Sequence, residues 1–516
     1  MRPSARFVLA ATLALAACSR DEGLSLAPPG VDGGAPGGPD LAVHFQELSW
    51  SANVQNKVDI LFVIDNSDGM GVIQQQLQNR FSQFFRTFQD LASATGTYAN
   101  LNIGVVTTDV GAGVAGAPGC TPSGPRGGGD QGLLQALGRL ATPDCLPPVG
   151  GHFIHYVFSG TGGGASNLPP GQTLIKTFTC MTAVGTGGCA YPHTLEAARL
   201  ALTTDLPDNL GFLRPEAQLV VVFVTNKDDG SAPPESDLFS GAPAGYPDRY
   251  QRQTRAGVVC GQPPAPPPEG PSGGPHADCG PAPNAAGLSS RLYDVQRYVD
   301  FFTQPRRLGG VKDDPTMVAL VAIDGTDAPF EVILSDPTTP WGQPYAPCGT
   351  PGPSCVPVLQ RSCAGASPGL TADPAVRLEA VVGAVASHKS TSVCESDYTP
   401  ALDAAEKVVG SSLGGHCLPR RVPRDGHGQP LFLCTVTDWS DWLVDGTPVP
   451  TDIPACDATH STVPCWLVEP KGVCGPPNNV SPEGVGLTVD YGPGQNGMPA
   501  EPQPDTTTRA RCQAID

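Results

Sequence analysis

The chain has 516 residues and a formal net charge of −19, because 49 acidic side chains outnumber 30 basic ones. A surface this acidic repels the phosphate backbone of nucleic acids, which excludes nucleic-acid binding as a function. Charged residues make up only 15% of the chain, and this excludes a long charged coiled coil.

The first residues predict an export signal. Two arginines precede an apolar stretch over residues 7–17, which is too short to span about 30 Å of hydrocarbon as a helix. The stretch runs into the letters LAAC at residues 15–18, which resemble the lipobox of bacterial lipoproteins, where the cysteine becomes lipidated. We therefore expect a signal peptide over residues 1–17 and an exported lipoprotein. A lipid on Cys18 would hold it in the outer membrane, facing the periplasm or the surface. An ordinary signal peptide followed by a chance cysteine is the alternative.

The 17 cysteines predict a disulfide-rich protein. The sequence has no C-x-x-C motif, which argues against a zinc ribbon or a thioredoxin-type site. Assigning Cys18 to the lipid leaves an even number, which predicts eight disulfides formed in an oxidising compartment. Both sides of Gly414 hold an even number, so we expect two separately cross-linked units. For the first unit we expect the sequence-local pairs Cys120–Cys145, Cys180–Cys189 and Cys260–Cys279.

Residues 18–44 are rich in Gly and Pro and predict a flexible tether. Beyond the tether, buried strands alternate with amphipathic helices. Continuous apolar runs predict strands at 58–64, 101–106, 219–224 and 317–323; apolar residues three and four apart predict helices at 77–91, 194–202, 292–302, 377–386 and 401–409. This alternation is typical of an α/β fold, a doubly wound and mostly parallel sheet with helices on both faces, which we place at residues 45–414.

Long segments rich in Gly, Pro and Cys interrupt this domain at residues 111–151, 229–286 and 327–372. Loops of this length are uncommon in compact domains, and cysteines are a natural way to hold them. They are candidates for carrying binding specificity. After Gly414 short strand-like runs lie among Pro, Gly and Cys, which predicts a small, disulfide-rich, β-rich unit at residues 415–516.

The loop after the first buried strand is the best candidate for a functional site. Residues 65–70 (DNSDGM) follow the strand VDILFVI, and ligands of open α/β sheets bind beyond the carboxyl ends of strands. Together with the VTTD at 106–109 and the VTN at 224–226, this order resembles a von Willebrand factor A domain, a Rossmann-type fold. The resemblance covers roughly residues 55–412, with the insertions excepted. Members of that family carry a D-x-S-x-S metal-ion-dependent adhesion site in this loop.

The resemblance implies a set of metal ligands that this chain matches in part. Asp65 corresponds to the first carboxylate and Ser67 to the first hydroxyl. Thr186 is the best match for the family's threonine. Gly69 stands where the family has its second serine, and Asn226 where it has its second aspartate. These two departures remove one oxygen and one negative charge, which weakens binding of a divalent cation.

Two interpretations of the loop remain open. In one, Mg²⁺ or Ca²⁺ binds, with Asp68 and Asp109 as further candidate ligands. In the other, the site holds no metal, and Asp65 and Ser67 only cap the following helix.

The sequence favours a non-enzymatic binding protein. The resemblance implies an adhesion-type domain that meets a protein or polysaccharide ligand at the cell envelope, with the lipid on Cys18 as the contact to the membrane. A structural envelope lipoprotein, whose domain is a metal-free scaffold, is the alternative from another class. A hydrolase is a remote alternative, because the sequence offers no recognisable nucleophile–base pair.

Overall fold

The computed structural model describes most of the chain beyond residue 43. The described residues are 44–51, 57–95, 99–112, 120, 128–158, 165–203, 206–236, 257–261, 274–283, 292–340, 342–352, 354–365, 369–403, 416–440, 449–457, 459–470, 474, 481–492, 502 and 506–515. The predicted signal peptide, Cys18, nearly all of the predicted tether and most of the insertion at 229–286 lie outside them. Among the described residues, no helix combines the length and the apolar character needed to cross a bilayer.

A six-stranded sheet forms the centre of the α/β part of the chain. Its strand order is β13-β8-β5-β2-β3-β4. The bounds are β2 Lys57–Ile64, β3 Asn100–Thr107, β4 Ile154–Val157, β5 Gln218–Val224, β8 Val318–Asp324 and β13 Ser387–Ser392. All neighbours pair in parallel except β4, which pairs antiparallel with β3. Thus the four strands predicted from apolar runs are β2, β3, β5 and β8, and they occupy the middle of the sheet.

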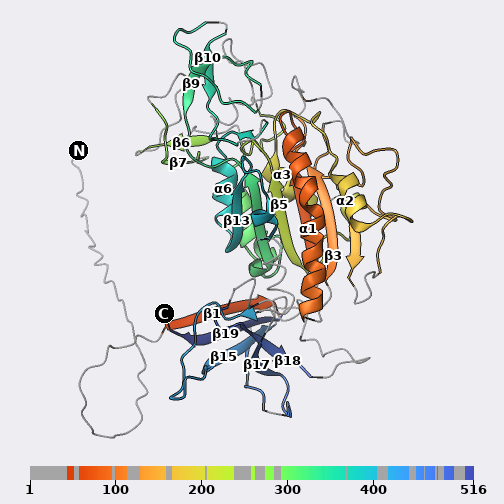
Figure 1. The fold of residues 1–516 in the computed structure, drawn as a ribbon, viewed down its shortest axis with the longest axis vertical. Coiled ribbons are helices and arrows are strands. Elements are labelled where there is room, and N and C mark those ends of the chain that lie inside the picture. Colours follow the sequence, from red (N-terminus) through yellow and green to blue (C-terminus); the bar gives the residue numbers. More distant parts are fainter. Residues whose placement is uncertain are drawn as a thin grey trace, which may run out of the picture. The chain divides into compact units, whose positions relative to one another are not determined.

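Alternate side chains of β2 enter two different cores, because successive strand residues point to opposite faces. Phe62 packs with helices α1 (Gly71–Thr95) and α2 (Leu174–Thr182) on one face. Val63 packs on the other face with helices α3 (Thr194–Leu202), α5 (Gln296–Thr303) and α6 (Val376–Val382). The fold is therefore a mixed α/β fold, with a mostly parallel sheet between two layers of helices (Figure 1).

Helix α2 was not predicted, and the helices that were predicted differ from the observed ones at their ends. The helix predicted at 77–91 is part of α1, whose buried phenylalanines at 81, 84, 85 and 88 follow the expected spacing. Helix α5 begins at Gln296 because the Asp294 carboxylate accepts the N–H of that residue at 2.9 Å. Helix α6 ends before Gly383, since glycine is a poor helix former. Part of the helix predicted at 401–409 lies outside the described residues.

The chain ends build a second, smaller set of sheets. Strands β1 (His44–Ser51), β19 (Thr507–Ala514), β15 (Cys434–Ser440) and β16 (Val449–Ile453) form an antiparallel sheet in that order. Strands β14 (His416–Cys417), β18 (Val485–Asp490) and β17 (Cys465–Pro470) form another. Together they enclose a separate core around Leu418, Val436 and Leu487. Strand β1 lies within the sequence range assigned to the α/β domain, yet it pairs with the last strand of the chain.

Short elements occupy the insertions. These are the strand pairs β6 (Val258–Cys260) with β7 (Cys279–Pro281), β9 (Val332–Ser335) with β10 (Val356–Leu359), and β11 (Cys363–Ala364) with β12 (Thr371–Ala372). The disulfide Cys260–Cys279 joins β6 to β7, Cys348–Cys355 closes the loop just before β10, and Cys363–Cys394 connects β11 to the segment after β13. Three 3-10 turns lie outside the insertions: η1 (Pro207–Asn209), η4 (Arg306–Leu308) and η5 (Pro315–Met317).

Eight disulfides pair all sixteen cysteines after Cys18, as predicted. They are Cys120–Cys189, Cys145–Cys180, Cys260–Cys279, Cys348–Cys355, Cys363–Cys394, Cys417–Cys474, Cys434–Cys512 and Cys456–Cys465. None crosses Gly414, which confirms two separately cross-linked groups. So many disulfides indicate an exported protein that folds in an oxidising compartment.

Two of the three expected pairs, Cys120–Cys145 and Cys180–Cys189, are wrong, whereas Cys260–Cys279 is confirmed. The segment before Cys145 runs alongside the end of α2. There Gly138 donates its N–H to the Cys180 carbonyl at 2.9 Å and Leu140 to the Ala183 carbonyl at 2.8 Å. These contacts bring Cys145 to Cys180. Tertiary hydrogen bonds, and not sequence proximity, therefore decide this pairing.

Candidate functional site

Asp65 stands directly after β2, at the carboxyl edge of the central strands. The register places the ends of β3 and β5 beside the end of β2, so the residues that follow these three strands meet there. Asp65 Oδ1 accepts the Ser67 N–H at 2.8 Å and the Thr108 hydroxyl at 3.2 Å. Asp65 Oδ2 accepts the Thr225 hydroxyl at 2.8 Å. The side chain is fully buried, so these donors replace water around the carboxylate.

Lys227 brings a second formal charge to the same place. Its ammonium Nζ donates to Ser67 Oγ at 2.7 Å, to the Asp68 carbonyl at 2.7 Å and to Asn226 Oδ1 at 3.3 Å. A lysine ammonium has three N–H protons to donate, and these three contacts can use one each. Lys227 is only 3% exposed, so its charge lies beneath the surface of the loop. Lys227 is not among the site residues predicted from the sequence.

Gly69 has a backbone conformation that limits which residue can replace it. Its φ of +92° lies in the left-handed region, which glycine adopts without steric cost and which a serine adopts only with strain. The position that the resemblance aligns with the second serine of the D-x-S-x-S motif therefore has a backbone conformation suited to glycine.

The loop that contains Thr186 lies beside the Asp65 loop. The Gln74 side chain of α1 donates to the carbonyls of Asp65 at 2.9 Å and Gly185 at 2.8 Å. The Gly188 N–H donates to the Asn66 carbonyl at 2.8 Å. Thr186 itself is exposed and its methyl group faces Gly71, at the start of α1. The predicted neighbourhood of Thr186 and Asp65 is therefore present.

The two further candidate ligands direct their carboxylates to other groups. Asp109 pairs with Arg139 at 3.3 Å, and Arg139 also pairs with Asp130 at 2.8 Å. Burial, followed by the neighbouring Asp130 charge, raises the pKa of Asp109. Asp68 is exposed, its carboxylate accepts the N–H of Gly69, and it is the Asp68 carbonyl that meets Lys227.

Two buried aspartates that follow Lys227 support the fold. Asp228 accepts the N–H groups of Arg377 at 3.0 Å and Leu378 at 3.1 Å, in the first turn of α6. Burial raises the pKa of Asp228 to about 7. Asp229 pairs with the fully buried Arg377 at 3.2 Å and accepts the Leu195 N–H of α3 at 2.9 Å. The chain after β5 is thereby fixed to two helices, which positions Lys227.

The residues that the resemblance implies as ligands do not fit a divalent cation. Ser67 Oγ and Asn226 Oδ1 are the two oxygens that would face an ion, and both accept protons from the Lys227 ammonium. The Asp65 carboxylate is bound by three protein donors. A hard cation needs several oxygens with free lone pairs, and it is repelled by an ammonium in the same place.

A second cluster resembles a metal site only by residue type. Side-chain atoms of Cys456, His460 and Cys465 lie within 4.8 Å of one another. However, Cys456 and Cys465 form a disulfide, and a metal requires cysteine as a thiolate. His460 Nδ1 lies 2.7 Å from a carboxylate oxygen of Asp490. We therefore assign no metal to this cluster.

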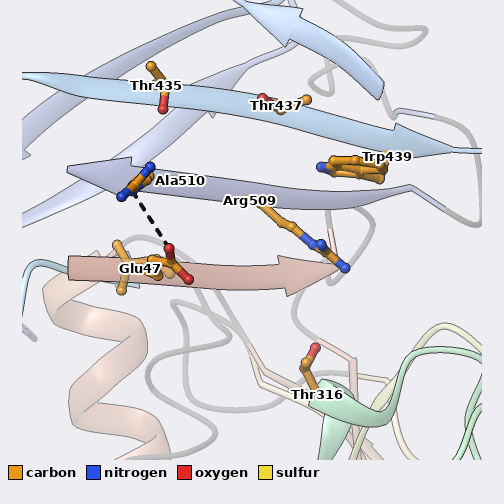
Figure 2. A pocket seen from close by; sticks show the side chains of 9 residues that line it. Glu47, Thr316, Thr435, Thr437, Trp439, Arg509 and Ala510 are labelled. Carbon is orange, nitrogen blue, oxygen red and sulfur yellow. Dashed lines mark ion pairs between the residues drawn. The ribbon is translucent and has the colours of Figure 1, made fainter. Parts of the chain in front are cut away.

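A hollow of about 490 Å³ lies on the antiparallel sheet of β1, β15 and β19 (Figure 2). Thr435, Thr437 and Trp439 of β15 line it, together with arginines of β19. The Arg509 guanidinium lies 5.0 Å from the centre of the Trp439 ring, and Arg511 pairs with Glu47 of β1 at 3.7 Å. Both arginines thus contact side chains of the same sheet, so the case for a functional site rests on the loops around Asp65.

Comparisons with known proteins place the chain in no family. No protein-family model and no curated protein matches it. Two crystal structures of the pilus adhesin SpaC from Lactobacillus rhamnosus GG are similar. The open conformation is 9% identical over 93% of this chain with a TM-score of 0.29, and a second form is 10% identical over 92% with a TM-score of 0.26. The alignments span 44% and 42% of the adhesin chains. Likeness at this level assigns neither fold family nor function.

Proposed function

We propose that this chain is a non-enzymatic, lipid-anchored binding protein of the bacterial cell envelope. In this proposal a doubly wound domain of the von Willebrand A type meets a protein or polysaccharide partner with the loops at the carboxyl edge of its sheet. The observation that carries the proposal is the meeting of the Asp65, Thr108 and Thr225 segments at that edge. In open α/β sheets this edge is where ligands bind.

The disulfides of the first group support a binding role for the insertions. Cys120–Cys189 and Cys145–Cys180 attach the insertion at 111–151 to the chain on either side of Thr186, in the second case to helix α2. Cross-linked loops lose less conformational entropy when they meet a partner, which favours binding. The lipid anchor of the proposal rests on the LAAC letters at 15–18, and the outer membrane is its proposed location.

Lys227 favours a second candidate function, a metal-free structural lipoprotein of the envelope. The Lys227 ammonium donates its protons to oxygens of the domain itself. The site then has no metal ion whose coordination sphere a partner's carboxylate could complete. In that case the domain would serve as a rigid scaffold.

Charge reversals at opposite edges of the sheet separate the two functions. Asp68 is exposed at the carboxyl edge, and Asp208 is exposed in η1, which leads into the amino end of β5. Chemical cross-linking of the intact envelope would compare wild type, Asp68→Arg and Asp208→Arg. The binding proposal expects a cross-linked adduct that Asp68→Arg removes and Asp208→Arg preserves. Adducts unaffected by Asp68→Arg would favour the scaffold.

A further inference from the structure

We propose that the Lys227 ammonium is a resident cation that takes the place of a divalent metal at this site, so that the domain is complete without any metal ion. The proposal rests on the likeness of the loop to an adhesion site, but it concerns only the chemistry of the loop itself. It therefore stands or falls independently of whether the domain binds a partner.

The Lys227 ammonium contacts oxygens from two loops at the carboxyl edge of the sheet. The ammonium contacts a serine hydroxyl from the loop after β2 and an amide oxygen from the loop after β5, together with a backbone carbonyl. A metal ion at this edge would have to contact oxygens of the same two loops. The lysine thus connects Ser67 and Asn226 across neighbouring strands, which is the structural task of the ion.

The formal charges at the site favour a monovalent cation. Asp65 supplies one formal negative charge, and Asn226 supplies none where a carboxylate would add a second. One ammonium balances one carboxylate, whereas a divalent cation would leave an excess positive charge in a buried place. Buried charges are tolerated when they are compensated and hydrogen-bonded. An asparagine at position 226 and a lysine at position 227 are therefore electrostatically compatible, because the neutral amide leaves a single carboxylate for the ammonium to balance.

The Lys227 ammonium is not accessible to a partner's carboxylate. The three ammonium contacts go to atoms of the domain itself, and the side chain is only 3% exposed. A partner's carboxylate would need an open coordination position on the cation, and these contacts fill it. Any partner must therefore be bound by the surrounding loops, in a manner that chelators do not affect.

The test measures the binding of Mn²⁺, used as the probe metal, to the exported full-length chain in detergent. Isothermal titration and thermal unfolding would compare wild type, Asn226→Asp and the double variant Lys227→Ala/Asn226→Asp. We expect the wild type to unfold at the same temperature in EDTA and in Mn²⁺. The double variant should bind Mn²⁺ at least about tenfold more tightly than wild type, because it removes the ammonium and restores a carboxylate.

Asn226→Asp alone is the critical arm, because it adds a carboxylate and retains the ammonium. Its new carboxylate should pair with Lys227, so Mn²⁺ affinity should stay at the wild-type level. Lys312→Ala is the matched control: Lys312 is equally buried and donates to the Arg214 and Ala217 carbonyls, both at 2.6 Å. This variant should lose stability without gaining Mn²⁺ affinity.

Three outcomes would overturn the proposal. The first is a wild-type unfolding temperature that rises with Mn²⁺ or falls with EDTA. The second is a tenfold gain in Mn²⁺ affinity for Asn226→Asp alone. The third is a folded double variant that binds no better than wild type. If the double variant does not fold, the first two measurements still decide. None of these readouts involves a partner, so a failure here is distinct from a failure of the proposed function.

Discussion

At the scale of single residues, the buried Asp65 carboxylate is stabilised by neutral hydroxyl donors. The hydroxyls of Thr108 and Thr225 reach it from the strands on either side of β2. A buried acceptor that loses a donor bears the cost of its desolvation, and this cost exceeds the net value of an average hydrogen bond. These threonines thus link the three strand ends energetically.

Replacing Thr225 with valine tests this link. Thr225→Val keeps the shape of the side chain but removes the donor to Asp65 Oδ2 and the acceptor of the Lys227 N–H at 3.0 Å, so we expect a loss of about 1–3 kcal/mol in the free energy of unfolding. Thr179→Val is the control, since this partly exposed threonine bonds only within α2, to the Ile175 carbonyl. Urea unfolding of both variants measures the difference. If both variants lose equally little unfolding free energy, the Asp65 carboxylate tolerates the loss of its hydrogen bond from Thr225.

Asp59, at the amino end of β2, gives a prediction about pH. Burial raises its pKa from 3.8 to about 6, although the charges of Lys312 and Arg214 oppose the shift. Between these two values the folded chain binds more protons at Asp59 than the unfolded chain, so this residue's contribution to stability falls as pH rises from about 4 to 6.

The variant Asp59→Asn removes this titration. We expect the difference in unfolding free energy between wild type and Asp59→Asn to shrink by up to about 3 kcal/mol as pH rises from 4 to 6. Thermal unfolding at several pH values measures it, and groups common to both chains cancel. A difference that grows with pH would show that the ion pair with Arg214, at 2.8 Å, outweighs burial.

Part of the candidate site could be predicted from the sequence, because residues that follow buried parallel strands meet at one edge. This rule brings Asp65, Ser67 and Asn226 into one neighbourhood, whereas Thr186, between α2 and α3, was assigned only through the resemblance. It could not show that Lys227 turns inward, since strand alternation no longer fixes side-chain direction once a strand has ended. One signal was available: a loop that lacks an expected aspartate has a lysine directly after the asparagine in its place.

At the scale of elements, the apolar runs identified the four central strands because a strand buried on both faces must be apolar throughout. The edge strand β13 escaped prediction, since all six of its side chains are polar and none of its residues is fully buried. The pairing of β1 with β19 was equally hidden, because no local pattern connects residues more than 450 positions apart. Long-range pairing is decided by the register of whole strands, which composition does not encode.

The disulfides give a prediction at this scale. Cys434–Cys512 joins directly paired residues of β15 and β19 and closes 78 residues, whereas Cys348–Cys355 closes seven. Loop-closure entropy gives about 4.5 kcal/mol for the first and about 2.4 kcal/mol for the second. The paired serine variant Cys434→Ser/Cys512→Ser should therefore lose more stability than Cys348→Ser/Cys355→Ser in denaturant unfolding. The reverse order would mean that residual structure in the unfolded chain dominates.

At the scale of the whole molecule, the cysteines divide into two chemical groups. Sixteen are paired within the described residues, and Cys18 is the one cysteine of the sequence left over. A count of free thiols on the exported, oxidised chain therefore reports on Cys18 alone. The free-thiol count therefore tests the proposed lipidation of Cys18.

We expect denaturing alkylation without prior reduction to find no free thiol on the membrane-bound chain, because a lipid blocks Cys18 and disulfides occupy the rest. Blocking lipid transfer should yield an exported precursor with one free thiol. In Cys18→Ser the count should be zero, and the chain should leave the membrane fraction or accumulate as an unprocessed precursor, because the proposed lipid can no longer be attached. Mass spectrometry of alkylated chains measures all three. One free thiol on the membrane-bound wild type would contradict lipidation at Cys18, and two or more in Cys18→Ser would contradict the eight disulfides.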